Sequence, residues 1–332
     1  MVITKTPFRI SFFGGGTDYP QWYETHGGAV LSATIDKYCY ITCRKLPPFF
    51  EHKHRLVYSV IENVISLSDI KHPSARETLK YLNYSDGFEI HHDGDLPARS
   101  GLGSSSSFTV GLVNAISALY EKILSKKDLA EKAIYIEQKL IGEYVGSQDQ
   151  IAAAYGGFNL INFYQDSTFN VSQLFLNKNR LNEFHSHILF LFTGISRFAS
   201  EVAKTKIDNF KIKEAELKLI QNMVNEAASI IQNANTPIEE FGRLLNESWL
   251  LKKSLSTMVS NLEIDGIYNT ALKSGAYGGK LLGAGNGGFM IFIAPPEKHH
   301  AIKTSLSNYL HVPFNFEHEG SKVVLYQPDG LN

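Results

Sequence analysis

The stretch Leu96-Pro-Ala-Arg-Ser-Gly-Leu-Gly-Ser-Ser-Ser-Ser-Phe108 combines two glycines, Gly101 and Gly103, with four consecutive serines. From Phe108 onward, apolar residues recur at helical spacing, which predicts a glycine-rich loop followed by a buried helix. The first N–H groups of such a helix lack partners within it and favour an anion, and hydroxyl groups donate to phosphate oxygens. The stretch therefore predicts a phosphate-binding site, with a serine-capped core helix as the alternative.

The composition narrows the class of protein before any further motif is assigned. The chain has 332 residues, 43% of them hydrophobic, and a formal net charge of −1. This length suffices for two domains, and the charge balance argues against binding to nucleic acid or to membranes through bulk charge. The two cysteines, Cys39 and Cys43, lie on one strand-like run, where a disulfide has poor geometry. We therefore expect a cytoplasmic protein with neither a nucleic-acid nor a membrane partner.

Alternation and helical periodicity predict a mixed α+β chain in two lobes. In the first half, strands are expected at 2–13, 28–44, 55–61, 88–92, 158–164 and 169–176, and helices at 104–122, 125–141 and 147–156. In the second half, strands are expected at 188–193, 289–294, 312–317 and 322–327, and helices at 199–233, 236–256, 263–274 and 296–309. The polar segment 177–186 separates the halves, so we predict domains at 1–182 and 183–332. Ser125, Ser147 and Thr236 each begin a capping-box pattern.

A second glycine-rich segment, Gly278-Gly-Lys-Leu-Leu-Gly-Ala-Gly-Asn-Gly-Gly288, has six glycines in eleven residues. It leads into a predicted strand rather than a helix, so it is not a dinucleotide-binding fingerprint. A tight hairpin accounts for part of the pattern. The excess of glycine over what a turn needs favours close approach of this backbone to a ligand.

Two acidic residues, Glu137 and Asp149, are twelve positions apart on successive predicted helices. Phosphoryl transfer needs one carboxylate to orient or deprotonate a hydroxyl and another to hold Mg²⁺, although each acid alone is compatible with a solvated or capping role. The histidines at positions 52, 54, 91 and 92 lack a third ligand at a recognisable spacing, so we assign them structural or surface roles. The charge run 204–218 is typical of a solvated helix face.

Three segments together resemble the GHMP kinase superfamily, which includes galactokinases, homoserine kinases and mevalonate kinases. They are Pro7-Phe-Arg-Ile-Ser-Phe-Phe-Gly-Gly-Gly-Thr-Asp-Tyr19, Pro97-Ala-Arg-Ser-Gly-Leu-Gly-Ser-Ser-Ser-Ser107 and Lys280-Leu-Leu-Gly-Ala-Gly-Asn-Gly-Gly288. The resemblance implies an N-terminal lobe like domain 2 of ribosomal protein S5 and a ferredoxin-like C-terminal lobe, with ATP in the groove. The expected contacts of the ATP phosphates are Pro97, Gly101, Leu102, Gly103, Ser104, Ser105, Ser106 and Ser107.

The same resemblance implies roles for individual residues. Arg9 and Asp149 are the expected catalytic residues: Asp149 orients or deprotonates the attacking hydroxyl, and Arg9 stabilises the charge near it. Ser105 and Glu137 are the expected ligands of Mg²⁺. The expected contacts of the sugar are Gly16, Thr17, Asp18 and Gly285.

Within the superfamily, Arg9-Ile-Ser-Phe-Phe-Gly-Gly-Gly-Thr-Asp18 and Thr193-Gly-Ile-Ser-Arg-Phe-Ala199 resemble the D-glycero-D-manno-heptose 7-phosphate kinases. This implies ATP- and Mg²⁺-dependent phosphorylation of the anomeric C1 hydroxyl of a small-molecule sugar phosphate, on the route to GDP-heptose. The phosphate that this sugar already carries needs cations, for which Arg99, Arg197 and Lys280 are the candidates. The alternatives are another sugar 1-kinase, such as an L-fucokinase-like enzyme, and a non-catalytic sensor of sugar and ATP.

Overall fold

The computed structural model describes residues 1–98, 100–195 and 199–328. Its larger sheet is built on two long antiparallel strands, β1 (Val2–Phe13) and β2 (Gly28–Lys45), both rich in the β-branched and aromatic residues that suit strands. The sheet extends from β2 through three shorter strands, β5 (Phe88–Gly94), β3 (His54–Val57) and β4 (Ile61–Val64). The first half of β2 pairs instead with β6 (Phe158–Phe163), which pairs with β7 (Phe169–Gln173).

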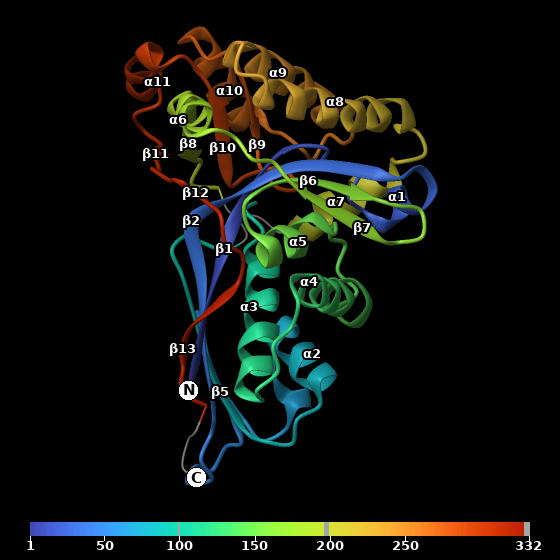
Figure 1. Cartoon of the computed structure of the whole chain (residues 1–332), viewed down its shortest axis with the longest axis vertical. Coiled ribbons are helices and arrows are strands. Elements are labelled where there is room, and N and C mark those ends of the chain that lie inside the picture. The colour runs from blue at the N-terminus through green and yellow to red at the C-terminus, as the bar shows by residue number, and fades with distance from the viewer. Residues whose placement is uncertain (99, 196–198, 329–332) are drawn as a thin grey trace.

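Helices cover one face of the long strands (Figure 1). The central one, α3 (Ser104–Leu119), packs against β1 and β2 and is buried on most sides, as its largely apolar sequence predicts. Around it lie α2 (Pro73–Leu82), α4 (Lys126–Tyr135) and α5 (Gln148–Tyr155). A π-helix, η2 (Ile136–Ile141), continues α4. Two short elements are α1 (Pro20–His26) and η1 (Leu67–Asp69).

The second lobe is a four-stranded antiparallel sheet in the order β11 (Leu310–His311), β8 (Ile188–Phe192), β10 (Phe289–Ile293) and β9 (Gly278–Leu281). Its long helices are α8 (Glu214–Gln232), α9 (Ile238–Ser254) and α10 (Leu262–Lys273), which lie together at the top of Figure 1. The shorter ones are α6 (Lys178–Ser186), α7 (Ala199–Asp208), η3 (Pro296–Lys298) and α11 (His299–Ser305). The expected α+β architecture in two lobes is confirmed.

The end of the chain returns to the first sheet. β12 (Phe316–Glu317) pairs with β2, and β13 (Lys322–Tyr326) pairs with β1 along its outer edge. Figure 1 shows this last strand running beside the N-terminal strand. The predicted boundary after residue 182 falls inside α6. The division 1–182 and 183–332 stays a prediction, and residues 316–326 belong by their pairing to the first sheet.

Two elements expected to be continuous are interrupted. The predicted helix 199–233 is divided into α7 and α8 by a turn at 209–213, because Phe210 turns inward and packs edge-on against Tyr19 and Trp22. The predicted strand 55–61 is divided into the hairpin of β3 and β4. In both places a tertiary contact or a turn overrides the local pattern.

One of the three predicted helix caps is confirmed and two are wrong. The Ser125 hydroxyl accepts a hydrogen bond from the Asp128 backbone N–H, 3.0 Å away. The Ser147 side chain does not cap α5, because its hydroxyl accepts a hydrogen bond from the Gln138 side chain at 3.0 Å. Helix α9 begins at Ile238 without a side-chain cap from Thr236.

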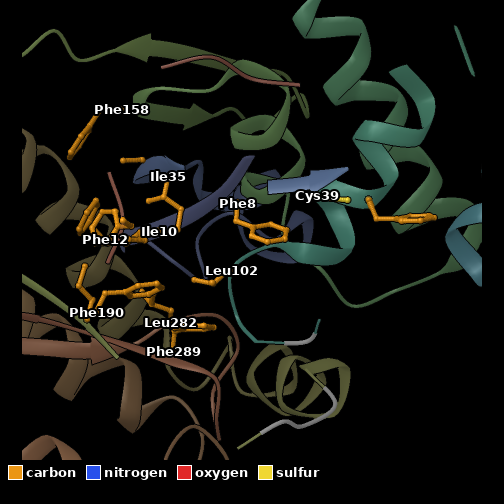
Figure 2. Close-up of a cluster of buried hydrophobic side chains, with 14 of the residues drawn as sticks. Phe8, Ile10, Phe12, Ile35, Cys39, Leu102, Phe158, Phe190, Leu282 and Phe289 are labelled. Carbon is orange, nitrogen blue, oxygen red and sulfur yellow. The ribbon is translucent and has the colours of Figure 1, made fainter. Parts of the chain in front are cut away.

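The largest apolar core is continuous between the two sheets. Phe12 stacks on Phe158 of the first lobe and contacts Phe241 of α9, with ring centroids 5.5 and 5.7 Å apart. Figure 2 shows Leu102 of the glycine–serine loop and Leu282 of the second glycine loop meeting within this core. Two motif-bearing loops are thus anchored by their own apolar side chains. The two cysteines are buried and free.

No helix within the described residues is both long and apolar enough to cross a membrane.

Candidate active site

A cavity of about 270 Å³ lies between the lobes, where the three predicted motifs meet. The glycine–serine loop, the loop after β1 and the second glycine loop all line it, together with the start of α5 and one face of α7. Within the described part of the chain, the charged side chains in its lining are Arg9, Asp18, Glu143, Asp149, Lys206, Lys252 and Lys280.

Arg9 and Asp149 form a closely held ion pair in this cavity. The guanidinium donates from Nε and Nη2 to Asp149 Oδ1, at 2.8 and 2.7 Å. Its Nη1 donates to the Gly101 carbonyl at 2.8 Å, and its backbone N–H donates to the Leu102 carbonyl. Both side chains are largely buried, so solvent screens the pair only weakly. The pair therefore fixes the carboxylate beside the glycine–serine loop.

The glycine–serine loop ends where α3 begins, and no side chain caps this helix. The residue before the helix, Gly103, has φ of +74°, a conformation that strongly favours glycine. A Cβ built on Gly101 would lie 2.7 Å from the carbonyl oxygen of Leu282, so the two glycine loops approach backbone to backbone. The N-terminus of α3, which no side chain caps, thus lies at the cavity, and a helix N-terminus of this kind favours an anion.

The serine that contacts Glu137 is Ser106, one position after the predicted Ser105. The Ser106 hydroxyl donates to Glu137 Oε2 at 2.8 Å, whereas Ser105 lines the cavity. Gln150 also donates to Oε2. Glu137 is fully buried, and this burial raises the pKa of its carboxyl to about 7. Its Oε1 has no hydrogen-bond partner among the described residues.

These two residues fit a magnesium site. A buried carboxylate with one unpartnered oxygen beside a hydroxyl is the hard oxygen donor set that Mg²⁺ prefers, and in kinases this ion takes few protein ligands because phosphates and water supply the rest. Groups of three or more His, Cys, Asp or Glu suited to a metal are absent from the described residues. Glu137 lies in the π-helix, an irregularity frequent at functional sites.

Asp18, which also lines the cavity, is held in place by two hydrogen bonds. Its Oδ1 accepts from the Gly16 N–H and its Oδ2 accepts from the Gln148 side chain, both at 2.9 Å. Burial raises the pKa of this carboxyl. A Cβ at Gly146 would lie 1.9 Å from Oδ2, which explains the glycine there.

Two buried oxygens near Asp18 have no partner within the described residues. They are the Ser11 hydroxyl and Gln148 Oε1, and both residues line the cavity. Because the amide nitrogen of Gln148 donates to Asp18, the amide oxygen of Gln148 remains available to accept a hydrogen bond. The arrangement suits the hydroxyl groups of a sugar.

Three buried lysines also line the cavity. Lys280 donates to the Phe12 carbonyl, and burial lowers its pKa to about 7. Lys252 donates to the carbonyls of Leu281 and Gly283. Lys206, on α7, lies within the charge run that was expected to be solvated. That expectation is wrong for this residue, because its side chain is 4% exposed.

Several predicted site residues serve the fold instead of lining the cavity. Leu102 is a core residue, and the Ser107 hydroxyl donates to the Pro7 carbonyl. The Thr17 hydroxyl donates to backbone carbonyls of the loop after β1 and of β2. Pro97 is exposed, and Gly285 packs against Val259. Arg99 and Arg197 lie outside the described residues.

Sequence reasoning missed some residues of the cavity. Gln148 and Ser11 belong to motifs already singled out, and their proximity to Asp149 and Arg9 was the available signal. Lys206 gave no signal, because a lysine in a charged helix is ordinarily solvated.

Comparisons with known proteins bear on the whole chain. The family models "GHMP kinases N terminal domain" and "GHMP kinases C terminal" match residues 70–157 and 229–312. D-glycero-alpha-D-manno-heptose 7-phosphate kinase of Campylobacter jejuni is 32% identical, with 96% of this chain and 97% of the relative covered. Galactokinase of Pyrococcus furiosus is 27% identical, with 91% of each chain covered.

A solved structure shows the same fold. The crystal structure of a D-glycero-D-manno-heptose 1-phosphate kinase from Bacteroides thetaiotaomicron matches with a TM-score of 0.79 and 25% identity, over 97% of this chain and 98% of that one. The three motif-bearing loops, the two-lobed fold and these matches together show that the chain belongs to the GHMP kinase family and is a phosphotransferase.

Proposed function

We propose that this GHMP kinase transfers the γ-phosphoryl group of ATP to the C1 hydroxyl of D-glycero-D-manno-heptose 7-phosphate and so forms the 1,7-bisphosphate. The observation that carries the proposal is the Arg9–Asp149 pair, which lies between an uncapped helix N-terminus and a polar, sugar-sized cavity. The choice of sugar follows the relative that is 32% identical and bears that name.

Asp149 is the residue that we assign to the acceptor hydroxyl. Both contacts from Arg9 go to Oδ1, and Oδ2 has no hydrogen-bond partner among the described residues. Oδ2 can therefore accept the C1 hydroxyl and take its proton as the oxygen attacks the γ-phosphorus. The bond from that phosphorus to the β–γ bridging oxygen breaks, and ADP leaves.

The rest of the site acts by positioning and by charge. Asp18, Gln148 and Ser11 hold the sugar ring, and the N-terminus of α3 holds the ATP phosphates. Arg9 offsets negative charge that develops near the attacking oxygen. Ser106 and Glu137 would hold Mg²⁺, which, when bound, neutralises charge on the phosphate oxygens.

The experiment is ADP release with Mg·ATP against a panel of acceptors. The panel contains heptose 7-phosphate, heptose 1-phosphate, free manno-heptose, mannose 6-phosphate, fucose and galactose. We expect efficient turnover only with heptose 7-phosphate. Preference for heptose 1-phosphate, the substrate in the name of the Bacteroides neighbour, would contradict the proposed acceptor, the C1 hydroxyl. Preference for fucose or another unphosphorylated sugar would show that the enzyme does not require a phosphate on its acceptor.

A further inference from the structure

Among the described residues, four cationic side chains line the cavity, and three of them are already engaged. Arg9 is paired with Asp149 and the Gly101 carbonyl. Lys280 and Lys252 donate to backbone carbonyls and so fix the loops that carry the motifs. The remaining one, Lys206, has no hydrogen-bond acceptor or ion-pair partner within the described residues.

The position of Lys206 is set by the packing of α7. Phe210, one turn further along, packs edge-on against Tyr19 with ring centroids 5.9 Å apart. On another face of the helix, the Thr205 hydroxyl contacts that of Ser256 at 3.1 Å, and Asn209, in the turn after α7, donates to the Leu255 carbonyl at 2.9 Å. These contacts present Lys206 to the cavity instead of to solvent.

The groups around Lys206 offset only part of the cost of burying its positive charge. Its Nζ lies 5.7 Å from the centroid of the Tyr19 ring, and burial lowers its pKa to about 8. Asp18 and Asp149 act against this lowering through their charges, without touching the ammonium group. A buried ammonium group without an acceptor is costly, so the site favours an anionic ligand at this point.

Two anionic groups enter this cavity in the proposed reaction: the phosphates of ATP and the phosphate of the sugar. The position of Lys206 favours the second. The ATP phosphates are assigned to the glycine–serine loop and α3. Lys206 lies on the second lobe against Tyr19, next in sequence to the sugar-positioning Asp18. Its charge is therefore available beside the residues assigned to the sugar.

We propose that Lys206 is a specificity-determining residue that binds the phosphate group already present on the acceptor sugar. This inference rests on the proposed function, because it assumes a phosphorylated acceptor. Lys206 thus supplies, from α7, a cation that the sequence pattern did not indicate.

The test compares Lys206→Met with Lys204→Met. Lys204 lies on the same helix but is exposed, with its ammonium group 6.0 Å from the Tyr144 ring. We expect Lys206→Met to raise KM for heptose 7-phosphate at least tenfold and to leave KM for ATP within about twofold, as expected for loss of a charge-assisted hydrogen bond. Lys206→Arg is expected to retain part of the affinity, and Lys204→Met to match the wild type.

Free manno-heptose separates a lost phosphate contact from general damage. We expect Lys206→Met to turn over free manno-heptose as slowly as the wild type does, so that the preference for the phosphorylated sugar shrinks. An equal loss with both sugars, or a rise in KM for ATP instead, would overturn the proposal, and thermal unfolding midpoints check that each variant is folded. If the wild type itself shows no preference for the phosphorylated sugar, the proposed function fails; if the wild type has the preference and Lys206→Met keeps it, only this inference fails.

Discussion

At the scale of single residues, the site depends on how each carboxylate is held. Arg9 gives both of its contacts with Asp149 to Oδ1, and Oδ2 has no hydrogen-bond partner among the described residues. Glu137 is also buried but receives only neutral donors on Oε2. The two acids therefore differ in their partners: Asp149 is paired with a guanidinium, whereas Glu137 is buried without a cation, and this burial raises its pKa.

The Asp149→Asn variant tests the assignment of the proton acceptor. Asparagine keeps the shape of the side chain but cannot take a proton, so we expect kcat to fall by about 10²- to 10⁴-fold. ATP affinity, measured by calorimetric titration without sugar, is expected to be unchanged. Asp69→Asn, at an exposed position, serves as the control. A kcat near that of the wild type would remove Asp149 from this role.

Glu137 predicts a pH dependence of stability in metal-free buffer. Its pKa of about 7 in the folded state exceeds the ordinary value of 4.5, so the folded protein binds this proton more tightly than the unfolded chain. The stabilisation is complete below pH 4.5 and is lost as the pH rises through about 7. We expect the wild type to lose on the order of 3 kcal/mol between pH 4.5 and 7.5 relative to Glu137→Gln.

The measurement is urea unfolding of both proteins across that pH range with a chelator present. Because Glu137→Gln cannot ionise, all other titrating groups cancel in the difference between the two curves. A difference that is flat, or that rises with pH, would show that the folded state does not hold Glu137 protonated.

At the scale of elements, the two glycine loops of the cavity meet backbone to backbone. A Cβ on Gly283 would lie 2.4 Å from the Gly101 Cα, and φ there is +70°. The obstructing atom is backbone and cannot rotate away. The loops therefore meet only if both positions are glycine.

Gly283→Ala is expected to separate the loops and weaken ATP binding. Gly142→Ala is the matched control, because φ is +76° there and nothing lies within 4 Å of its Cβ. Both variants carry the cost of a left-handed alanine, about 1–2 kcal/mol, but only Gly283→Ala adds the clash. We expect KM for ATP to rise at least tenfold in Gly283→Ala and to stay near the wild-type value in Gly142→Ala.

Elements with a local signal were predictable from the sequence. The strand 2–13 is observed with those bounds, and the helix expected from residue 104 begins there, because alternation and the loop–helix junction are encoded in neighbouring residues. The break at 209–213 was not predictable, since it depends on Phe210 reaching Tyr19, nearly two hundred residues earlier.

For the candidate site, the sequence predicted which motifs take part but not how their individual side chains are oriented. The serine run fixed the loop but not which hydroxyl faces Glu137, because that depends on the rotation of α3 against the π-helix. The position of Lys206 in the cavity could not be predicted for a similar reason. A charged helix predicts solvent exposure, and only the docking of α7 turns this lysine inward.

At the scale of the whole molecule, the two lobes share one core. The Phe241 ring of α9 contacts the rings of Phe12, Phe13 and Phe184, at centroid distances of 5.7, 5.2 and 4.8 Å. The last strand, β13, ties the end of the chain to β1. The cavity between the lobes thus rests on a continuous apolar base, and we expect the chain to unfold as one unit.

Two tryptophans make this testable, because Trp22 lies on α1 and Trp249 on α9. In the Trp22→Phe and Trp249→Phe backgrounds, the remaining indole reports either α9 or the contact of α1 with α8, and we expect the two denaturation curves to coincide. Phe241→Ala should lower the free energy of unfolding by about 3–5 kcal/mol and move both curves together. Phe175→Ala, whose ring is 84% exposed, should move neither. If Phe241→Ala shifted only the Trp249 curve, the molecule would unfold in more than one cooperative unit, and the expectation of a single shared core would be wrong.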